Sequence, residues 1–391
     1  MKSTYTSAFW TMGASAAAAF LMMSQIYMVA PITGEIARNL KFGGYLKALM
    51  IPSITLPIAC SALFSRSLIS CLGERTLARA TALALAIGPF LSYLSPDGYF
   101  LVGSRILTGL CLGSLLPLSF RFITQNFPVS QRFFPIMIIV FGMAGGMTFG
   151  PVLGAMFYPY FGWRADFLAV AILSLIFFFL VNHYSNHIVN ISRRDKPVPL
   201  RGKIKYGIIW NGGSLYILSF IFLNGIFHAG LFVWTISTVT ERYGLGDISL
   251  GLLLLDFGLP GLFLVVVLGL FSRGPSSIKM EFIGLAILGF CIILIILQVA
   301  PWLTFLAIAF LSIGYNITQP LFFGIVRKIN NSDKAQMALN LGCCLLFTGY
   351  GIGPLIFGRL LEYGNLPSVF CLLFLVACLA TISKTIFRDD E

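Results

Sequence analysis

Three residues that could hold or pass a charge lie inside long apolar stretches of the chain: Arg105, His228 and Asp256. A charge at bilayer depth costs roughly 2.5–3.5 kcal/mol on insertion scales, so each needs a partner, a wet cavity or a bound proton. Asp256 is the one carboxylate well inside such a stretch, which makes it the first candidate for a proton carrier. His228 is a candidate to share that proton.

The spacing of these residues suggests where they meet. His228 and Asp256 lie at similar distances on either side of the polar loop around Arg242, so they should reach similar depth on antiparallel neighbouring helices. Arg105 belongs to the same half of the membrane. Each has a purely structural alternative: an ion pair or hydrogen bond for Asp256, a capped polar patch for His228 and helix positioning for Arg105.

Composition defines the elements that must position these residues. The chain has 391 residues, of which 58% are hydrophobic and 10% charged. Soluble domains carry about 25% charged residues, so a water-soluble globule is excluded. The length fits twelve helices of about 20 residues with short connections, and the fold class is therefore an all-α membrane protein.

The apolar runs fall into two sets of six with a polar, basic stretch between them. The expected organisation is an amino-terminal six-helix half over 1–183, a basic cytoplasmic linker over 184–206 and a carboxy-terminal six-helix half over 207–391. The twelve expected spans lie near 8–32, 45–64, 77–95, 99–121, 134–158, 165–183, 207–236, 248–271, 282–300, 302–326, 336–358 and 366–386.

Basic residues orient the chain. With both termini in the cytoplasm, the cytoplasmic segments hold about three times as many Lys and Arg as the outer segments. The sequence therefore predicts a multi-pass protein of the cell (inner) membrane with both termini inside. Because the basic residues are spread over separate loops, the net charge of +12 indicates topology and no nucleic-acid partner.

The two halves repeat each other. Similar residues recur about 205 positions apart in equivalent spans, which is typical of transporters with a binding site between repeats. The matching pairs are Leu63–Arg66 with Leu270–Arg273, Gly109 with Gly314, Pro117 with Pro320, and Gly150-Pro151 with Gly353-Pro354.

Three sequence motifs resemble those of the major facilitator superfamily. The first follows the second span, where Arg66, Gly73 and Arg75 match its G-x-L-x-D-R-x-G-R-R loop, with Ser65 in place of the acidic residue. In the family that acid helps to latch the two halves on the cytoplasmic side. The substitution therefore leaves open whether this chain keeps the latch.

The other two motifs lie in the fourth and fifth spans. Arg105, Gly109 and Gly113 resemble R-x-x-x-G-x-x-x-G, the family's site of proton transfer or gating. The fifth span is similar to the G-x-x-x-G-P-x-x-G-G signature of the drug/proton antiporter branch. Its matching residues are Gly146, Gly150, Pro151 and Gly154, with Ala155 replacing the last glycine. Glycines four apart also let helices pack closely, which is an equally good explanation.

The resemblance implies a substrate cavity lined by the first, fourth, seventh and tenth spans. Few polar groups among many aromatics suit an amphipathic or aromatic substrate. The polar residues of these spans are Gln25, Tyr27, Thr108, Asn224, Tyr315, Asn316 and Gln319.

These observations predict a proton-coupled secondary transporter that exports a small organic molecule (a drug, metabolite or siderophore-like compound) by alternating access. No G-x-x-x-x-G-K-[ST] motif is present, so a proton gradient should supply the energy, with no cofactor and no metal. Expected partners are membrane lipid, the small-molecule substrate and protons, and the protein should be a monomer. An uptake carrier for a sugar, siderophore or metabolite is the main alternative. A membrane enzyme or scaffold is remote, because three scattered histidines give no catalytic cluster.

Overall fold

The computed structural model describes residues 2–188, 212–271, 278–318 and 332–363. Within these ranges the chain is helical and contains no strand, so the predicted all-α fold class is confirmed. The first residues of the predicted linker, 184–188, continue the last helix before it, and the rest of the linker and the twelfth span lie outside the described residues.

The helices before the linker form the amino-terminal helix group. Its members are α1 (Lys2–Tyr27), α2 (Val29–Asn39), α3 (Gly44–Ala48), α4 (Pro52–Leu63), α5 (Ser65–Leu72), α6 (Glu74–Tyr93), α7 (Gly98–Leu112), α8 (Leu115–Asn126), α9 (Phe133–Phe161) and α10 (Trp163–Ile188). A short 3-10 turn, Val129–Gln131, precedes α9.

The helices after the linker form the carboxy-terminal helix group. Its described members are α11 (Gly212–Tyr243), α12 (Asp247–Phe271), α13 (Ile278–Ile296), α14 (Pro301–Thr318) and α16 (Ser332–Leu360), followed by a 3-10 turn at Leu361–Tyr363.

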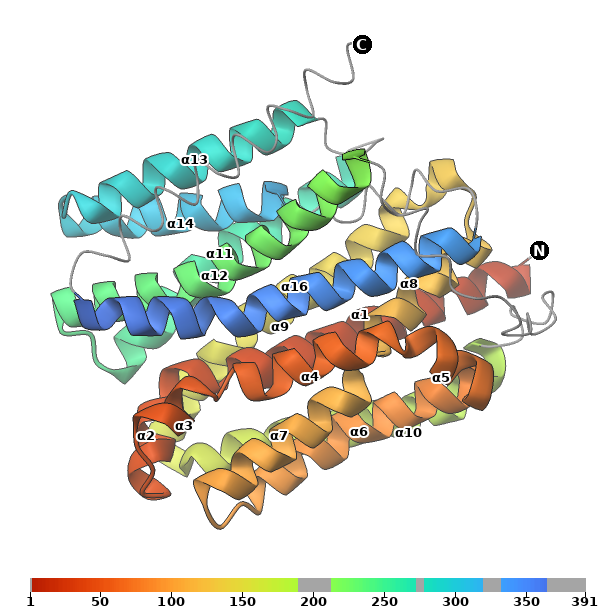
Figure 1. Cartoon of the computed structure of the whole chain (residues 1–391), viewed down its shortest axis with the longest axis horizontal. Helices are drawn as coiled ribbons and strands as arrows, with labels where there is room; N and C mark the ends of the chain where they lie inside the picture. Colours follow the sequence, from red (N-terminus) through yellow and green to blue (C-terminus); the bar gives the residue numbers. More distant parts are fainter. Residues whose placement is uncertain (1, 189–211, 272–277, 319–331, 364–391) are drawn as a thin grey trace.

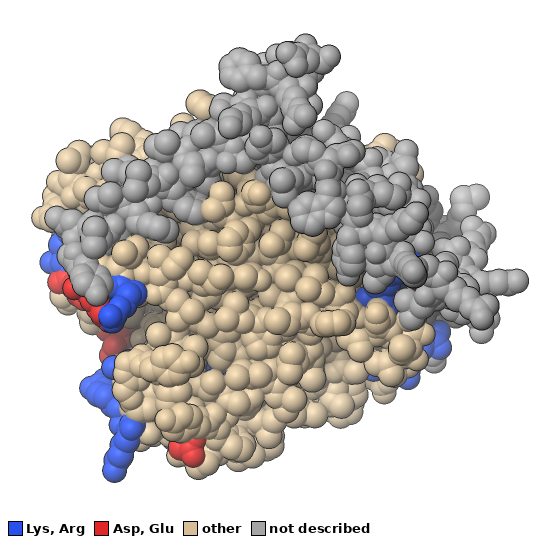
Figure 2. Space-filling view, viewed as in Figure 1, with Lys and Arg blue, Asp and Glu red and all other residues tan. Residues whose placement is uncertain are grey.

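Several of these helices are membrane spans by length and composition. In the described residues, seven are long and apolar enough to cross a bilayer, and nine if each of two bent pairs is one span. The bent pairs are α1 with α2, at 45°, and α4 with α5, at 64°. On the face shown in Figure 2, charged residues lie at the edges of the molecule and leave a broad region between them without visible charge, as expected for a membrane protein.

Two helix pairs make the most extensive contacts between the amino-terminal group and the carboxy-terminal group. α9 packs along α12, and α4 packs along α16. Within the groups, α1 packs along α9 and α11 along α16, so long helices run roughly side by side through the molecule (Figure 1).

Glycines allow equivalent close approaches in the two groups. A Cβ on Gly150 would lie 2.7 Å from the Cα of Ser24, and one on Gly349 would lie 2.6 Å from the carbonyl oxygen of Phe222. Gly146 faces Phe20 of α1, just as Gly349 faces Phe222 of α11. Helix α9 therefore meets α1 as α16 meets α11, backbone against backbone.

On both α9 and α16, a proline directly follows a glycine of the contact face. Pro151 and Pro354 lie inside these two helices, directly after Gly150 and Gly353. Gly353 packs on the backbone of Ile226 in α11. Each proline removes one backbone hydrogen bond where its helix contacts α1 or α11, which permits local bending there.

Candidate functional site

A cavity lies at the centre of the molecule between the two helix groups. Its free volume is about 30 Å³, enough for water-sized molecules, so a larger ligand requires the two helix groups to move apart. Five helices supply its walls: α1 and α9 from one group, and α11, α12 and α14 from the other. The lining residues are Tyr27, Ala144, Met147, Thr148, His228, Phe232, Phe257, Gly258, Ser312, Tyr315 and Asn316.

Aromatic rings dominate this central cavity. The ring of Tyr27 is edge-on to Phe232 at 5.4 Å and 86°, and Phe232 is edge-on to Phe257 at 5.3 Å and 76°. The imidazole of His228 stacks on Tyr315 with centroids 3.4 Å apart. These pairs hold the side chains in a fixed arrangement, because edge-to-face and stacked geometries are the favourable ones for aromatic rings.

Two buried polar atoms of the cavity have no hydrogen-bond partner among the described residues. They are Oη of Tyr27 and Nδ1 of His228, on side chains that are 1% and 4% exposed. In contrast, Oη of Tyr315 shares a hydrogen bond of 3.0 Å with Oη of Tyr350, and Asn316 donates to the carbonyl of Ser312. Buried polar atoms normally find a partner, so the two unpaired atoms mark where a ligand or water would bind.

Asp256 lies outside the lining of this cavity, although its neighbour Phe257 is part of it. Leu252, Leu259 and Phe263 share its face of α12 and are 56%, 42% and 71% exposed. Asp256 itself is half-buried, and its Oδ2 has no hydrogen-bond partner among the described residues. Asp256 therefore lies on the more exposed side of α12 and does not line the cavity that contains His228.

Arg105 is fully inside the amino-terminal group and also lies outside the central cavity. Its Nε donates to the carbonyl of Met50 at 2.8 Å, and its Nη atoms donate to the carbonyls of Gln25 and Ile26 at 3.2 and 3.5 Å. These carbonyls lie at the end of α1 and just before Pro52 of α4, where the helices break. The guanidinium therefore satisfies backbone groups at two helix ends, consistent with a positioning role.

Two residues expected in the substrate cavity are engaged elsewhere. The amide of Gln25 donates to the carbonyl of Leu85 at 2.8 Å, a carbonyl left without its helical partner because Pro89 has no N–H. Thr108 packs against Gly88 between α6 and α7, and its hydroxyl donates to the carbonyl of Ser104. Both side chains therefore stabilise helix packing.

The remaining cavity candidates divide as follows. Tyr27, Tyr315 and Asn316 line the cavity. Asn224 is buried on α11 but outside the lining. Gln319 lies outside the described residues.

The loop and fourth-span motifs pack the amino-terminal group. Gly109 and Gly113 of α7 lie against the backbone of Ile54 and Ile58 in α4. Gly73 has a positive φ of 78° where α5 turns into α6, a conformation that favours glycine.

The residues around this turn differ in burial. Arg66 and Arg75 are half-buried on α5 and α6. Ser65, at the position of the family's acid, is fully buried, and its hydroxyl has no hydrogen-bond partner among the described residues. It supplies no charge for a latch.

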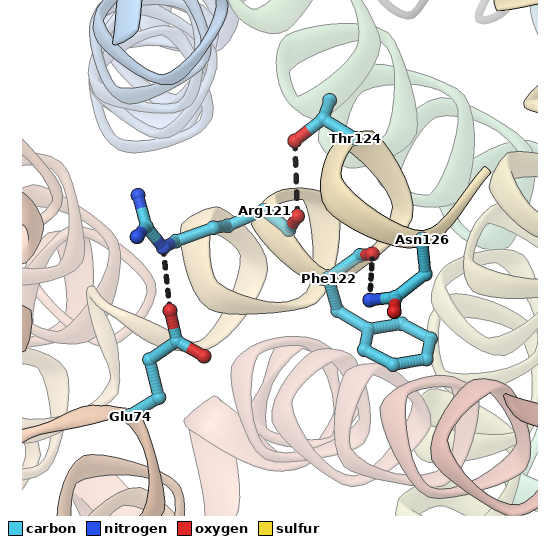
Figure 3. A network of polar contacts seen from close by, with 5 residues as sticks. All are labelled: Glu74, Arg121, Phe122, Thr124 and Asn126. Atoms are coloured by element: carbon cyan, nitrogen blue, oxygen red, sulfur yellow. Dashed lines mark hydrogen bonds and ion pairs between the residues drawn. The ribbon is translucent and has the colours of Figure 1, made fainter. Parts of the chain in front are cut away.

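A second cavity lies inside the amino-terminal group at the predicted cytoplasmic end. It has a free volume of about 110 Å³ and is lined from α1, α6, α8 and α10 by mostly apolar side chains. Near its mouth, Arg121 of α8 forms an ion pair with Glu74 of α6 at 2.6 Å (Figure 3). Thr124 and Asn126 donate to backbone carbonyls of the same α8 segment. This cavity is larger than the central one, but only one helix group contributes to it, so it is the weaker candidate for a translocated molecule.

Sequence reasoning missed three residues at or near buried polar positions. Tyr350 of α16 shares a hydrogen bond with Tyr315, and Thr148 of α9 lines the cavity from the fifth span, where only a conformational or packing motif was expected. Asp166 of α10 is a buried carboxylate, with Oδ2 unpaired among the described residues. An acid in the first turn of an apolar run was the available signal for Asp166, whereas the position of Tyr350 depends on tertiary packing.

The helical bundle and the cavity between its two groups define a polytopic membrane transporter. A family model described as Major Facilitator Superfamily matches residues 15–345, and the chain belongs to this superfamily.

Three curated proteins are similar to the chain at low identity. The uncharacterized MFS-type transporter YbcL of Bacillus subtilis (strain 168) is 23% identical over 317 residues, covering 75% of this chain and 78% of that protein. The uncharacterized MFS-type transporter YubD of the same organism is 26% identical over 207 residues, 51% of this chain and 38% of YubD. An uncharacterized transporter of Buchnera aphidicola subsp. Baizongia pistaciae is 21% identical over 274 residues, 68% of this chain and 64% of that protein.

Proposed function

We propose that this transporter exports a small organic molecule in exchange for protons, by alternating exposure of the central cavity to the two sides of the membrane. The observation that carries the proposal is the cavity itself. It is small, mostly apolar and built from both helix groups, so a movement of one group against the other changes access to it.

Two titratable residues are proposed to take part in proton exchange. His228 lines the cavity, where a substrate and a proton could compete for the same place. Asp256 precedes the cavity residue Phe257 on α12, and we keep it as the proposed proton carrier because intramembrane carboxylates are usually functional. Arg105 is proposed to act on the conformational change, through the helix ends that it holds.

Export is proposed on the glycine pattern of α9. Gly146 and Gly150 face the backbone of α1, and Gly154 faces that of Met28 directly after it, so the pattern serves packing whichever way the substrate moves. Its similarity to the antiporter branch favours outward flux. We further propose location in the cell (inner) membrane with both termini cytoplasmic, from the distribution of basic residues.

Proton flux in everted membrane vesicles tests this proposal. With the interior acidified, addition of a transported compound should release protons, because the substrate enters in exchange for them. Asp256→Asn should abolish this release. Asp247→Asn is the matched control, since Asp247 is exposed at the start of the same helix and should leave exchange unchanged.

Two outcomes would contradict parts of the proposal. An unchanged pH profile of exchange in Asp256→Asn would exclude Asp256 as the proton carrier. Substrate-driven proton entry in right-side-out vesicles, with no release from everted ones, would show an uptake carrier in place of an exporter.

A further inference from the structure

We propose that the central cavity takes an uncharged, flat aromatic molecule carrying one hydrogen-bonding substituent. This assignment rests on the proposed transport function, because it treats the cavity as the substrate site. It is argued from the rings, the unpaired polar atoms and the charges of the lining.

The rings of the cavity favour a flat aromatic partner. Tyr27, Phe232 and Phe257 come from three different helices and follow one another edge to face. On another wall, Tyr315 and His228 are already stacked. Tyr27 and His228 bring these walls into contact, with ring centroids 6.3 Å apart. A planar ring that enters when the helix groups move apart can continue the same edge-to-face and stacked pattern, which a flexible aliphatic chain cannot do.

The unpaired polar atoms favour a single hydrogen-bonding substituent. Oη of Tyr27 and Nδ1 of His228 are buried without a partner among the described residues, and the centroids of the two rings are 6.3 Å apart. One hydroxyl or amide group both donates and accepts, so it can satisfy both atoms. A molecule without such a group leaves them unsatisfied at a cost in affinity.

The charges of the lining favour a neutral molecule. Among the described residues, no Lys, Arg, Asp or Glu lines the cavity. In the proposed exchange the substrate and the proton occupy the cavity in turn, so His228 is neutral when the substrate binds, and a carboxylate or sulfonate would be buried without a counter-ion. A quaternary ammonium could lie against the ring faces, but it donates no hydrogen bond and would leave Tyr27 and His228 unpaired.

Calorimetric titration of the full chain in lipid nanodiscs tests the substrate class with matched probes. The probes are 2-naphthol, naphthalene, naphthalene-2-sulfonate, 2-naphthyltrimethylammonium and decahydro-2-naphthol. We expect 2-naphthol to bind roughly tenfold more tightly than either charged probe and several-fold more tightly than naphthalene or the saturated alcohol.

Two ring-preserving variants test the assigned atoms. Tyr27→Phe and His228→Phe remove the polar atoms and keep the aromatic walls, so each should weaken 2-naphthol binding about fivefold and leave naphthalene unchanged. Together they should abolish the preference for 2-naphthol over naphthalene. Tyr160→Phe is the control, because Tyr160 is 71% exposed and distant from the lining. The ratio between two probes is insensitive to a general loss of folded protein.

The outcomes separate the substrate class from the proposed transport. Tighter binding of a charged probe, an unchanged probe ratio in the double variant, or no binding of 2-naphthol would each overturn the substrate class. Binding as expected, without any compound-driven proton movement in vesicles, would overturn proton-coupled exchange and leave the substrate class standing.

Discussion

Gln25 and Arg105 both donate hydrogen bonds to backbone carbonyls where the helices are interrupted. These two side chains were expected to act on a substrate or a proton. Pro89 leaves the carbonyl of Leu85 without its helical donor, and Gln25 supplies one. Arg105 does the same for carbonyls near the end of α1 and the start of α4. In a membrane no water replaces a missing donor, so such repairs are strongly favoured.

Whether Gln25 compensates for the missing N–H of Pro89 can be tested with a pair of variants. Gln25→Leu should lower the free energy of unfolding by about 1–3 kcal/mol, since the carbonyl of Leu85 is left buried and unpaired. In a Pro89→Ala background the residue at position 89 has an N–H that can bond to Leu85, so Gln25→Leu should cost much less there. Unfolding in mixed detergent micelles, followed by circular dichroism, measures both. Equal costs in the two backgrounds would refute this role of Gln25.

Arg105 gives a second prediction at the level of single residues. Arg105→Lys should destabilise the protein by roughly 2 kcal/mol, because an ammonium cannot reach three carbonyls on two helices as the guanidinium fork does. The transport rate should fall while KM stays unchanged, since Arg105 lies outside the cavity lining. A raised KM with normal stability would instead indicate direct contact with the substrate.

Among the helices, the closest packing depends on glycine. Gly150→Ala places a Cβ 2.7 Å from the Cα of Ser24, so α9 and α1 must move apart, and we expect a cost of about 1–3 kcal/mol. Gly349→Ala should cost a similar amount on the contact between α16 and α11. Gly103→Ala on α7 is the control, because nothing lies within 4 Å of its Cβ, and it should be neutral or stabilising. Thermal unfolding of the three variants checks the order.

Much of the element level could be predicted from sequence, because apolar runs and their interruptions are local signals. The helical fold class and most spans followed from them. The cavity candidates Tyr27, Tyr315 and Asn316 came from the resemblance to the superfamily, which indicated the spans that line its cavity. The directions in which side chains point could not be predicted from the sequence. Gln25 and Tyr27 are neighbours on one helix, yet Gln25 bonds to α6 and Tyr27 faces the cavity. The exposed stripe around Asp256 likewise depends on how α12 is rotated against its neighbours, which a uniformly apolar sequence leaves undetermined.

At the scale of the whole molecule, alternating access requires the contact between α9 and α12 to open at one end at a time. Met156 meets Gly251 near one end of this contact, where their Cβ atoms would be 4.0 Å apart, and Met137 meets Gly269 near the other, at 3.3 Å. The first distance suits a disulfide and the second is slightly short for one.

Paired cysteines at these positions test the movement. In a background with the eight native cysteines replaced, oxidation of either Met156→Cys/Gly251→Cys or Met137→Cys/Gly269→Cys should stop transport, and reduction should restore it. Each single-cysteine variant is the control. Continued transport by a fully cross-linked pair would show that this end of the contact stays closed during the cycle.

Helix α6 also constrains how the protein is made. It begins with Glu74 and Arg75, contains Pro89 and is absent from the helices apolar enough to cross a bilayer alone. During synthesis it therefore cannot partition from the translocon into lipid by hydrophobicity alone, and needs an earlier helix to lower the cost. Helix α1 leaves the ribosome before α6 and carries Gln25, the donor that the carbonyl of Leu85 lacks. We therefore expect membrane insertion of α6 to be cooperative with that of α1, which would act as an intramolecular chaperone for it.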